Sequence, residues 1–227
     1  MEVEVRYCPS YSLAIVKLKS GESITAEAGA MVSTSSGVTI ETEAAGGLLT
    51  SLKRKFLGGE SLFMNTYTAP AKGGEVTLAP PLPGDMKVCS LKQESLMVQS
   101  GSYVASSRGV NLDTKWAGAK AFFAREGLFM LKASGTGIVI ISSYGAIHEV
   151  ELEPDEHYIV DTGHLVAFTE GVSFKIKRVG GLKSTLFSGE GLVVDLSGSG
   201  RVILQTRSDD AFLSWLIPRL PKERSGS

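Results

Sequence analysis

Short runs of alternating apolar and polar residues, separated by glycines, extend over most of the chain. Near the amino terminus, Val3, Val5 and Tyr7 alternate with charged residues, and a period of two is typical of a strand that is buried on one face. Aliphatic and β-branched runs predict further strands at residues 11–19, 86–91, 137–142 and 147–152. The pattern therefore predicts a mainly β protein.

One eight-residue pattern occurs three times along the chain. Each copy has a short apolar run, a polar residue, a small residue and a glycine, with apolar residues after it. The copies are ITAEAGAM, LMVQSGSY and YIVDTGHL, and their glycines are Gly29, Gly101 and Gly163. A strand-like run, a glycine-containing apolar segment and another strand follow each copy. Such self-similarity indicates several copies of one supersecondary unit that share buried faces.

The repeats divide the chain into three related units and a closing element. The units span approximately residues 3–73, 74–135 and 136–199, and a closing strand and helix follow at 200–220. A cut at any of these boundaries would expose half-buried sheets, so we predict a single domain over residues 1–227. We expect the three β units to pack as sandwiches or as a closed β prism, with short connecting helices and a carboxy-terminal helix.

A basic amphipathic helix is predicted within residues 45–58. Its apolar positions at helical spacing are Leu48, Leu49, Leu52 and Phe56, and the basic residues beside them are Lys53, Arg54 and Lys55. Such a helix can lie on an anionic membrane or recruit a partner. The alternative is that it closes one end of its unit with solvated basic residues. The other two units favour this alternative, because they carry an apolar segment there without the basic cluster.

The carboxy-terminal segment predicts a capped helix that begins after Ser208. Asp209 and Asp210 suit the positive end of its dipole, and Pro218 is expected to end it. The apolar positions exceed what one helix face needs: Phe212, Leu213, Trp215, Leu216 and Ile217. Either this tail packs on its own sheet in a monomer, or a neighbouring molecule covers it. We predict the second, a homo-oligomer with closed cyclic symmetry and with Trp215 at the contact.

Composition and charge narrow the class of protein. The 227 residues carry a net charge of −1, so there is no global basic field to attract nucleic acid. The first residues, MEVEVRY, are acidic where a secretory signal is basic, and no apolar stretch approaches the roughly 20 residues that span a bilayer. Two cysteines without such a signal indicate reduced thiols, and we expect a cytoplasmic protein.

No residue pattern marks a catalytic, cofactor or metal site. Glu60, Glu126 and Glu190 occupy one repeated position and could bind a hard cation, but capping of their own glycine-rich turns is the simpler interpretation. The three histidines lack zinc-site spacing, and the chain has neither a GxSxG nucleophile motif nor a P-loop. We therefore predict no catalytic residue, no cofactor and no metal ligand.

Two stretches resemble a known family. GGLLTSLKRKFLGGESLFMNTY and GEGLVVDLSGSGRVILQTRS are similar to the mitochondrial biogenesis family named for altered inheritance of mitochondria. The resemblance implies a mainly β fold similar to the tryptophan RNA-binding attenuation protein, trimeric assembly and no established enzymatic activity. It also implies a link, in the eukaryotic members, to the organisation of the mitochondrial inner membrane. Without a targeting extension, this chain looks like a prokaryotic member.

These observations favour a non-enzymatic scaffold or binding protein that acts at or near a membrane. Its expected partners are copies of itself and a protein or membrane surface. The alternatives are a single-stranded RNA-binding protein and an enzyme without a recognisable motif. Similarity of fold to an RNA-binding protein carries little weight, because the predicted strands are aliphatic rather than aromatic and basic.

Overall fold

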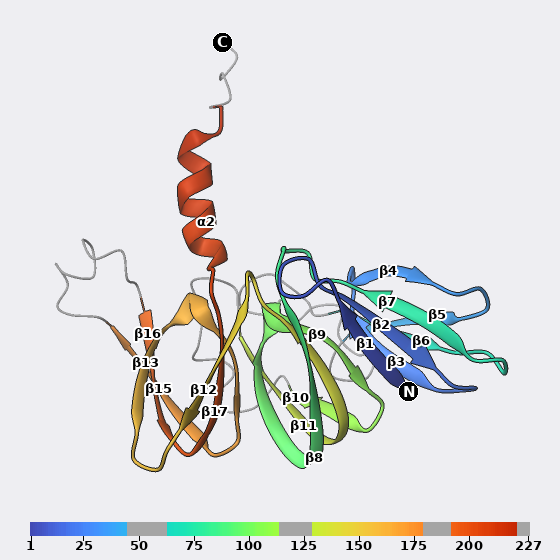
Figure 1. The fold of residues 1–227 in the computed structure, drawn as a ribbon, viewed down its shortest axis with the longest axis horizontal. Helices are drawn as coiled ribbons and strands as arrows, with labels where there is room; N and C mark the ends of the chain where they lie inside the picture. Colours follow the sequence, from blue (N-terminus) through green and yellow to red (C-terminus); the bar gives the residue numbers. More distant parts are fainter. Residues whose placement is uncertain (45–62, 114–128, 179–191, 222–227) are drawn as a thin grey trace.

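The computed structural model describes residues 1–44, 63–113, 129–178 and 192–221. These residues form a mainly β body from which one helix projects near the carboxy terminus (Figure 1). The predicted mainly β class and the carboxy-terminal helix are confirmed. The helix predicted within 45–58 lies outside the described residues, and so do Lys53, Arg54 and Lys55.

The strands of the described residues form three sheets, and every pairing between these strands is antiparallel. The first sheet has the order β1 (Glu2–Arg6), β2 (Leu13–Leu18), β7 (Gly74–Leu78), β4 (Met31–Thr34). The second has the order β12 (Ile147–Leu152), β17 (Gly200–Gln205), β14 (Leu165–Thr169), β8 (Met86–Gln99), β11 (Met130–Ser142), β9 (Tyr103–Ser107), β3 (Ser23–Glu27), β6 (Phe63–Thr68), β5 (Thr39–Ala44), with β10 (Val110–Asp113) also on β11. The third has the order β13 (His157–Asp161), β16 (Leu192–Gly198), β15 (Val172–Arg178).

Short helices lie between or after these strands. They are η1 (Ser100–Ser102), η3 (Thr162–His164), α2 (Asp209–Leu216) and η4 (Ile217–Arg219). The 3-10 helices η1 and η3 contain Gly101 and Gly163, so two of the three repeated glycines lie in the same kind of turn. Gly29 lies in a turn with a φ of +95°, a conformation that favours glycine.

The alternation of side chains in the strands follows the predicted period of two. In β2, Ala14, Val16 and Leu18 are buried and the residues between them are not. In β1, Val3 and Val5 are half-buried between exposed charged residues. These alternating positions place one face of each strand against the core, where burial of apolar area stabilises the fold.

The same irregular pairing occurs in three places. β4 on β7, β9 on β11 and β14 on β17 each show a register shift within the first three residues of the shorter strand. The residue passed over is Val32, Val104 or Val166, and each of these follows its repeated glycine by three positions. A β-bulge bends a strand and increases its twist, so each of these strands turns in the same way after its glycine.

In the part of the chain that the structure describes, the core consists of three clusters of buried side chains, and each cluster joins strands of neighbouring predicted units. One surrounds Ile24 and Tyr67 of the first unit and includes Val104 of the second. Another surrounds Phe168 and Leu196 of the third unit and includes Met97 of the second. The third cluster lies around β8 and β11 in the middle of the chain.

The described strands form an open row rather than a closed body. β4 pairs only with β7 and β13 pairs only with β16, so each ends its sheet among the residues that the structure describes. These two strands lie at opposite ends of the row (Figure 1). The packing is sandwich-like, as one of the two predicted alternatives has it, and no sheet closes into a barrel.

Candidate interaction surface

The helix α2 begins as its sequence predicts. The Oγ of Ser208 accepts a hydrogen bond from the backbone N–H of Ala211 at 3.3 Å, and Asp209 and Asp210 occupy the first turn. α2 ends at Leu216 and continues as the 3-10 turn η4, which contains Pro218. The predicted cap at Ser208 is confirmed, and the α-helix ends before Pro218 as predicted.

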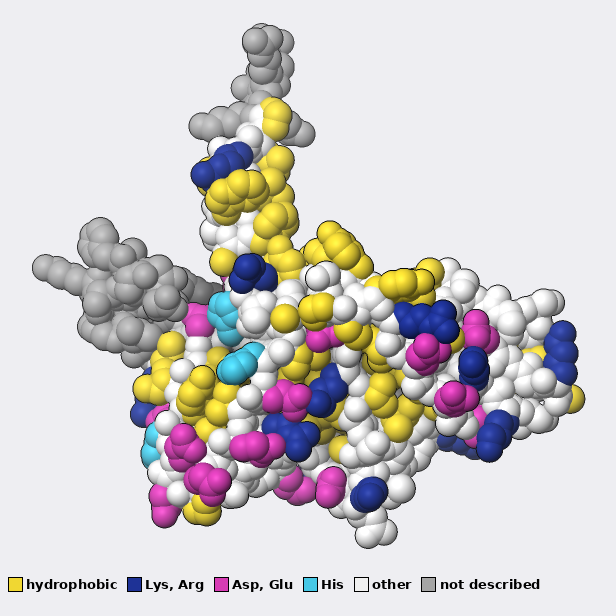
Figure 2. Space-filling model, in the orientation of Figure 1, with side chains coloured by type: hydrophobic (Ala, Val, Ile, Leu, Met, Phe, Trp, Pro, Cys, Tyr) yellow, Lys and Arg dark blue, Asp and Glu magenta, His cyan; other side chains and the backbone are white. Residues whose placement is uncertain are grey.

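No residue of α2 or η4 is buried. Several large apolar side chains are therefore exposed: Phe212 by 38%, Leu213 by 44%, Trp215 by 55%, Ile217 by 61% and Leu220 by 52%. We call residues 209–220 the apolar arm. Figure 2 shows its hydrophobic side chains along the helix that projects from the body. The alternative in which the tail packs on its own sheet is therefore not the arrangement that the structure shows.

Contacts within the apolar arm hold Trp215 in place. Its ring lies nearly parallel to that of Phe212, with centroids 6.3 Å apart. The guanidinium of Arg219 lies 4.8 Å from the Trp215 ring centroid and donates a hydrogen bond to the Trp215 carbonyl at 2.6 Å. Tryptophan and arginine are enriched where binding energy concentrates in protein interfaces. The arm thus presents an ordered aromatic anchor.

The arm meets the body beside the third repeated glycine. Phe212 contacts the ring of Tyr144 edge-on, with centroids 6.2 Å apart. A Cβ on Gly163 would lie 2.8 Å from the Oγ of Ser208, so the glycine lets the helix cap approach the turn. Gln205 supports the same place, because its Nε2 donates to the Gly163 carbonyl at 2.8 Å and its Oε1 accepts from the Tyr144 N–H at 2.9 Å.

A small cavity lies at the base of the apolar arm. Its volume is about 50 Å³, and its lining includes Pro80, Leu82, Tyr144, Gln205 and Asp209. A water molecule occupies about 30 Å³ in the liquid, whereas ligand sites measure about 300 Å³ or more. This cavity can hold one or two waters and is too small for a cofactor.

A buried carboxylate in the third sheet is fully engaged in structural contacts. Asp195 is 5% exposed; its Oδ1 lies 3.0 Å from Nδ1 of His157, and its Oδ2 accepts from Lys177. The hydrogen bond from Lys177 first, and that from His157 second, hold the pKa of the Asp195 carboxyl below its usual value. The carboxylate therefore stays charged and ties β13 and β15 to the strand between them.

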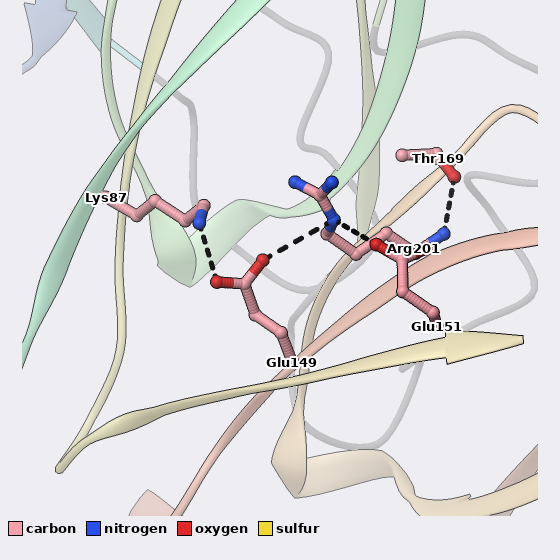
Figure 3. A network of polar contacts seen from close by, with 5 residues as sticks. All are labelled: Lys87, Glu149, Glu151, Thr169 and Arg201. Carbon is pink, nitrogen blue, oxygen red and sulfur yellow. Dashed lines mark hydrogen bonds and ion pairs between the residues drawn. The ribbon is translucent and has the colours of Figure 1, made fainter.

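A second polar network links β8 with β12, β17 and β14 (Figure 3). Glu149 accepts from Lys87 at 2.6 Å and lies 3.5 Å from Arg201, which donates to Glu151 at 2.7 Å. The backbone N–H of Arg201 also donates to the Thr169 hydroxyl at 2.9 Å. The hydrogen bond to Glu151 raises the pKa of Arg201. Each charge in this network already has a partner of opposite sign.

Cys89 does not supply an activated thiol next to this network. Both cysteines are free, and burial raises the pKa of the Cys89 thiol to about 11. A nucleophilic cysteine needs a lowered pKa, so Cys89 is inert at neutral pH. Across the described ranges, no three His, Cys, Asp or Glu side chains gather as a metal-binding group. Glu60, Glu126 and Glu190 lie outside those ranges.

Among the predicted interaction residues, the structure places Trp215 on the exposed apolar arm and does not describe Lys53, Arg54 or Lys55. Within the described part, no helix is long and apolar enough to cross a membrane. Sequence reasoning missed the unpaired edges of β4 and β13. Alignment of the three repeats could have indicated them, because the first and last copies have no neighbour on one side.

Comparison with known proteins comes from sequence and from structure. A family model described as mitochondrial biogenesis AIM24 matches residues 3–207. An uncharacterised protein of Streptococcus pyogenes serotype M6, M6_Spy0233, is 25% identical over 219 residues, which cover 93% of this chain and 88% of that protein. The crystal structure of SPYM3_0169 from Streptococcus pyogenes has a similar fold, with a TM-score of 0.81 at 23% identity, over 96% of this chain and 99% of the other.

Proposed function

The chain belongs to the mitochondrial biogenesis AIM24 family, and on that premise we propose that it is a non-enzymatic scaffold or binding protein. The observation that carries the proposal is the apolar arm. Its large apolar side chains other than the half-buried Leu216 are exposed, and Phe212 and Arg219 hold the Trp215 ring. Exposed apolar patches mark binding surfaces in soluble proteins. Among the described residues, neither the small cavity nor the Cys89 thiol, whose pKa is raised, supports a catalytic site.

The charge of the apolar arm favours a protein surface as its partner over a lipid surface. Its first turn carries Asp209 and Asp210, and its one basic residue, Arg219, lies over Trp215. Helices that lie on anionic membranes carry a basic polar face. Membrane contact would then need a further basic segment, and Lys53, Arg54 and Lys55 are the candidates from the sequence.

We further propose that the chain is a homo-oligomer, with a trimer favoured, and that its three units are copies of one β unit in a single domain. The three equivalent bulges at Val32, Val104 and Val166 support the relation between the units. The apolar arm and the open ends of the sheets support self-association, because isolated molecules seldom leave such features uncovered.

The experiment that tests this function compares Trp215→Glu with Ser214→Glu. Both substitutions add one negative charge to exposed positions of the same helix, but only the first removes the aromatic anchor. Light scattering reports the oligomer, and flotation with vesicles of anionic lipid reports membrane contact. We expect Trp215→Glu to weaken one of these associations and Ser214→Glu to leave both unchanged. If both variants match the wild type in both assays, the apolar arm contributes neither to the oligomer nor to contact with anionic membranes.

A further inference from the structure

Two pairings between neighbouring units have the same register. β3 of the first unit pairs with β9 of the second through Ile24↔Ser107, Thr25↔Ser106 and Ala26↔Ala105. β8 of the second unit pairs with β14 of the third through Leu96↔Thr169, Met97↔Phe168 and Val98↔Ala167. Counted from the repeated glycines, both junctions pair positions −5, −4 and −3 of one unit with positions +6, +5 and +4 of the next.

At the two ends of the row, β4 and β13 are equivalent to the strands that pair at these junctions, but each lacks the junction partner. β4 is the counterpart of β9 and β14, since it follows its glycine and has the same bulge on its inner side. β13 is the counterpart of β3 and of the second half of β8, since it precedes its glycine and pairs with one strand on its inner side. On the outer side of β4 and β13, no described strand pairs.

Side chains at equivalent positions are buried in the strands of the junctions and exposed in β4 and β13. The valine three positions after the glycine is 3% exposed at Val104 and 0% at Val166, where a preceding unit covers it. The same position is 58% exposed at Val32, where no unit precedes it. Four positions before the glycine, Met97 is 4% exposed, whereas Ile159 on β13 is 65% exposed.

These edges also lack the residues that block pairing. Natural sheets protect their edges with lysine, proline or inward-pointing charges. β4 has the sequence MVST and β13 the sequence HYIVD, so neither contains lysine or proline, and the one carboxylate is at the end of β13. Asp161 at that end is already engaged, because its side chain accepts from the Gly163 N–H at 2.9 Å.

We propose that β13 of one copy of this chain pairs antiparallel with β4 of a second copy, in the register of the internal junctions. The predicted partners are Tyr158↔Ser35, Ile159↔Thr34 and Val160↔Ser33. The partner is a second copy because β4 and β13 of one chain lie at opposite ends of the row (Figure 1). After this contact the first copy keeps a free β4 and the second copy keeps a free β13, so the contact is head to tail and closes as a ring or continues as a filament.

The inference deepens the self-association proposed above and rests on it. Substitution of two exposed isoleucines, one on β13 and one on β5, tests it. Ile159→Lys puts a charge on the outer edge of β13, whereas Ile40→Lys puts the same charge on β5, where Ile40 is 45% exposed. We expect the wild type and Ile40→Lys to have the mass of two or more chains of 24.1 kDa. The mass of Ile159→Lys should fall to that of a single chain. Circular dichroism checks that both variants fold.

A disulfide provides a second measurement that does not depend on loss of binding. Directly opposed residues of an antiparallel pair have Cβ atoms about 4.5–5.5 Å apart, close enough for a disulfide after a small adjustment. In a Cys8→Ser, Cys89→Ser background, Thr34→Cys with Ile159→Cys should cross-link copies to one another under mild oxidation. Either cysteine alone, or Ile40→Cys with Ile159→Cys, should not.

The possible outcomes separate this inference from the proposed self-association. An oligomer that Ile159→Lys leaves intact, with no cross-link in the double variant, overturns the edge pairing and leaves self-association through another surface. A wild-type mass of 24.1 kDa at low micromolar concentration overturns both. If Ile159→Lys does not fold, the cross-link decides alone.

Discussion

The junctions between predicted units and the two open ends of the row of strands use residues at the same distances from the repeated glycines. At the junctions these residues are buried, and at the open ends they are exposed. Each of the three predicted units has a valine three residues after its glycine, and Val104 and Val166 are buried whereas Val32 is not. The residue type alone therefore does not decide burial here. The neighbouring unit decides it, and the first unit has no described neighbour on that side.

The ends differ from the junctions in one further respect. Where β9 and β14 have Ala105 and Ala167 at the pairing position, β4 has Ser33, whose hydroxyl lies 2.6 Å from that of Thr77. A more polar strand costs less free energy when water covers it. The difference indicates an edge that tolerates exposure in the free chain and can still pair through its backbone.

The largest expected effect comes from removal of a strand that lies between two others. Deletion of residues 201–206 removes all of β17 except Gly200. This strand pairs with both β12 and β14 and supplies the buried Val202 and Ile203. We expect this variant not to fold, as judged by circular dichroism and by the absence of a cooperative melt. Truncation after Ser208, which removes the exposed arm, should leave a cooperative melt. A soluble, cooperatively melting deletion variant would show that β17 is dispensable.

A matched pair of substitutions tests burial at the junction directly. Val166→Asp places a charge at a fully buried position, and we expect it to cost more than about 4 kcal/mol of unfolding free energy. Val32→Asp makes the same change at an exposed end and should cost within about 0.5 kcal/mol. Urea unfolding at a concentration low enough to keep the chain monomeric measures both. Equal costs would mean that Val32 is buried in the isolated chain.

Acid should loosen the end at β13 before it affects the apolar junctions. The pKa of Asp195 is lowered chiefly by its hydrogen bond from Lys177, so its contribution to stability is present above the ordinary value of 3.8 and is lost as pH falls through the lower folded value. Asp195→Asn should therefore lower stability at neutral pH and flatten its dependence on pH below 3.8. Thermal melts of both proteins over the acid range measure this. Parallel curves for the two proteins would remove Asp195 as the cause.

The smallest expected effect is at the charged network of Figure 3. Arg201 and Glu149 are about half and one-third exposed, and ion pairs at such positions contribute roughly 0–1 kcal/mol. Glu149→Gln keeps the shape of the side chain and should cost less than about 1 kcal/mol in urea unfolding. A much larger cost would show that charge, rather than apolar burial, holds the second and third units together.

The repeats in the sequence predicted the general form of the fold because glycines and alternating strands are local signals. The anchor at Gly29 has the positive φ that only glycine adopts readily, and Gly163 permits a close approach to Ser208. The cap of α2 was also local and was predicted correctly. The alternation of apolar and polar residues could not by itself identify the open ends, because a period of two is the same in paired and unpaired strands.

The same limit applies to the candidate surface. Trp215 was identified because the tail has more apolar positions than one helix face can bury, but the sequence left open whether its own sheet would cover it. The network of Lys87, Glu149 and Arg201 joins residues far apart in the chain and has no local signal at all. Its members meet only after the strands have paired.

Amide hydrogen exchange of the wild-type chain, measured at submicromolar and at high micromolar concentration, tests head-to-tail pairing most directly. Backbone N–H groups of an unpaired edge exchange with water, and pairing with another strand protects them. We predict that protection of residues 31–35 and 157–161 rises with concentration, while β9 and β14, which are already paired on both sides, remain unchanged. Exchange at β4 and β13 that is equally fast at both concentrations would contradict the account.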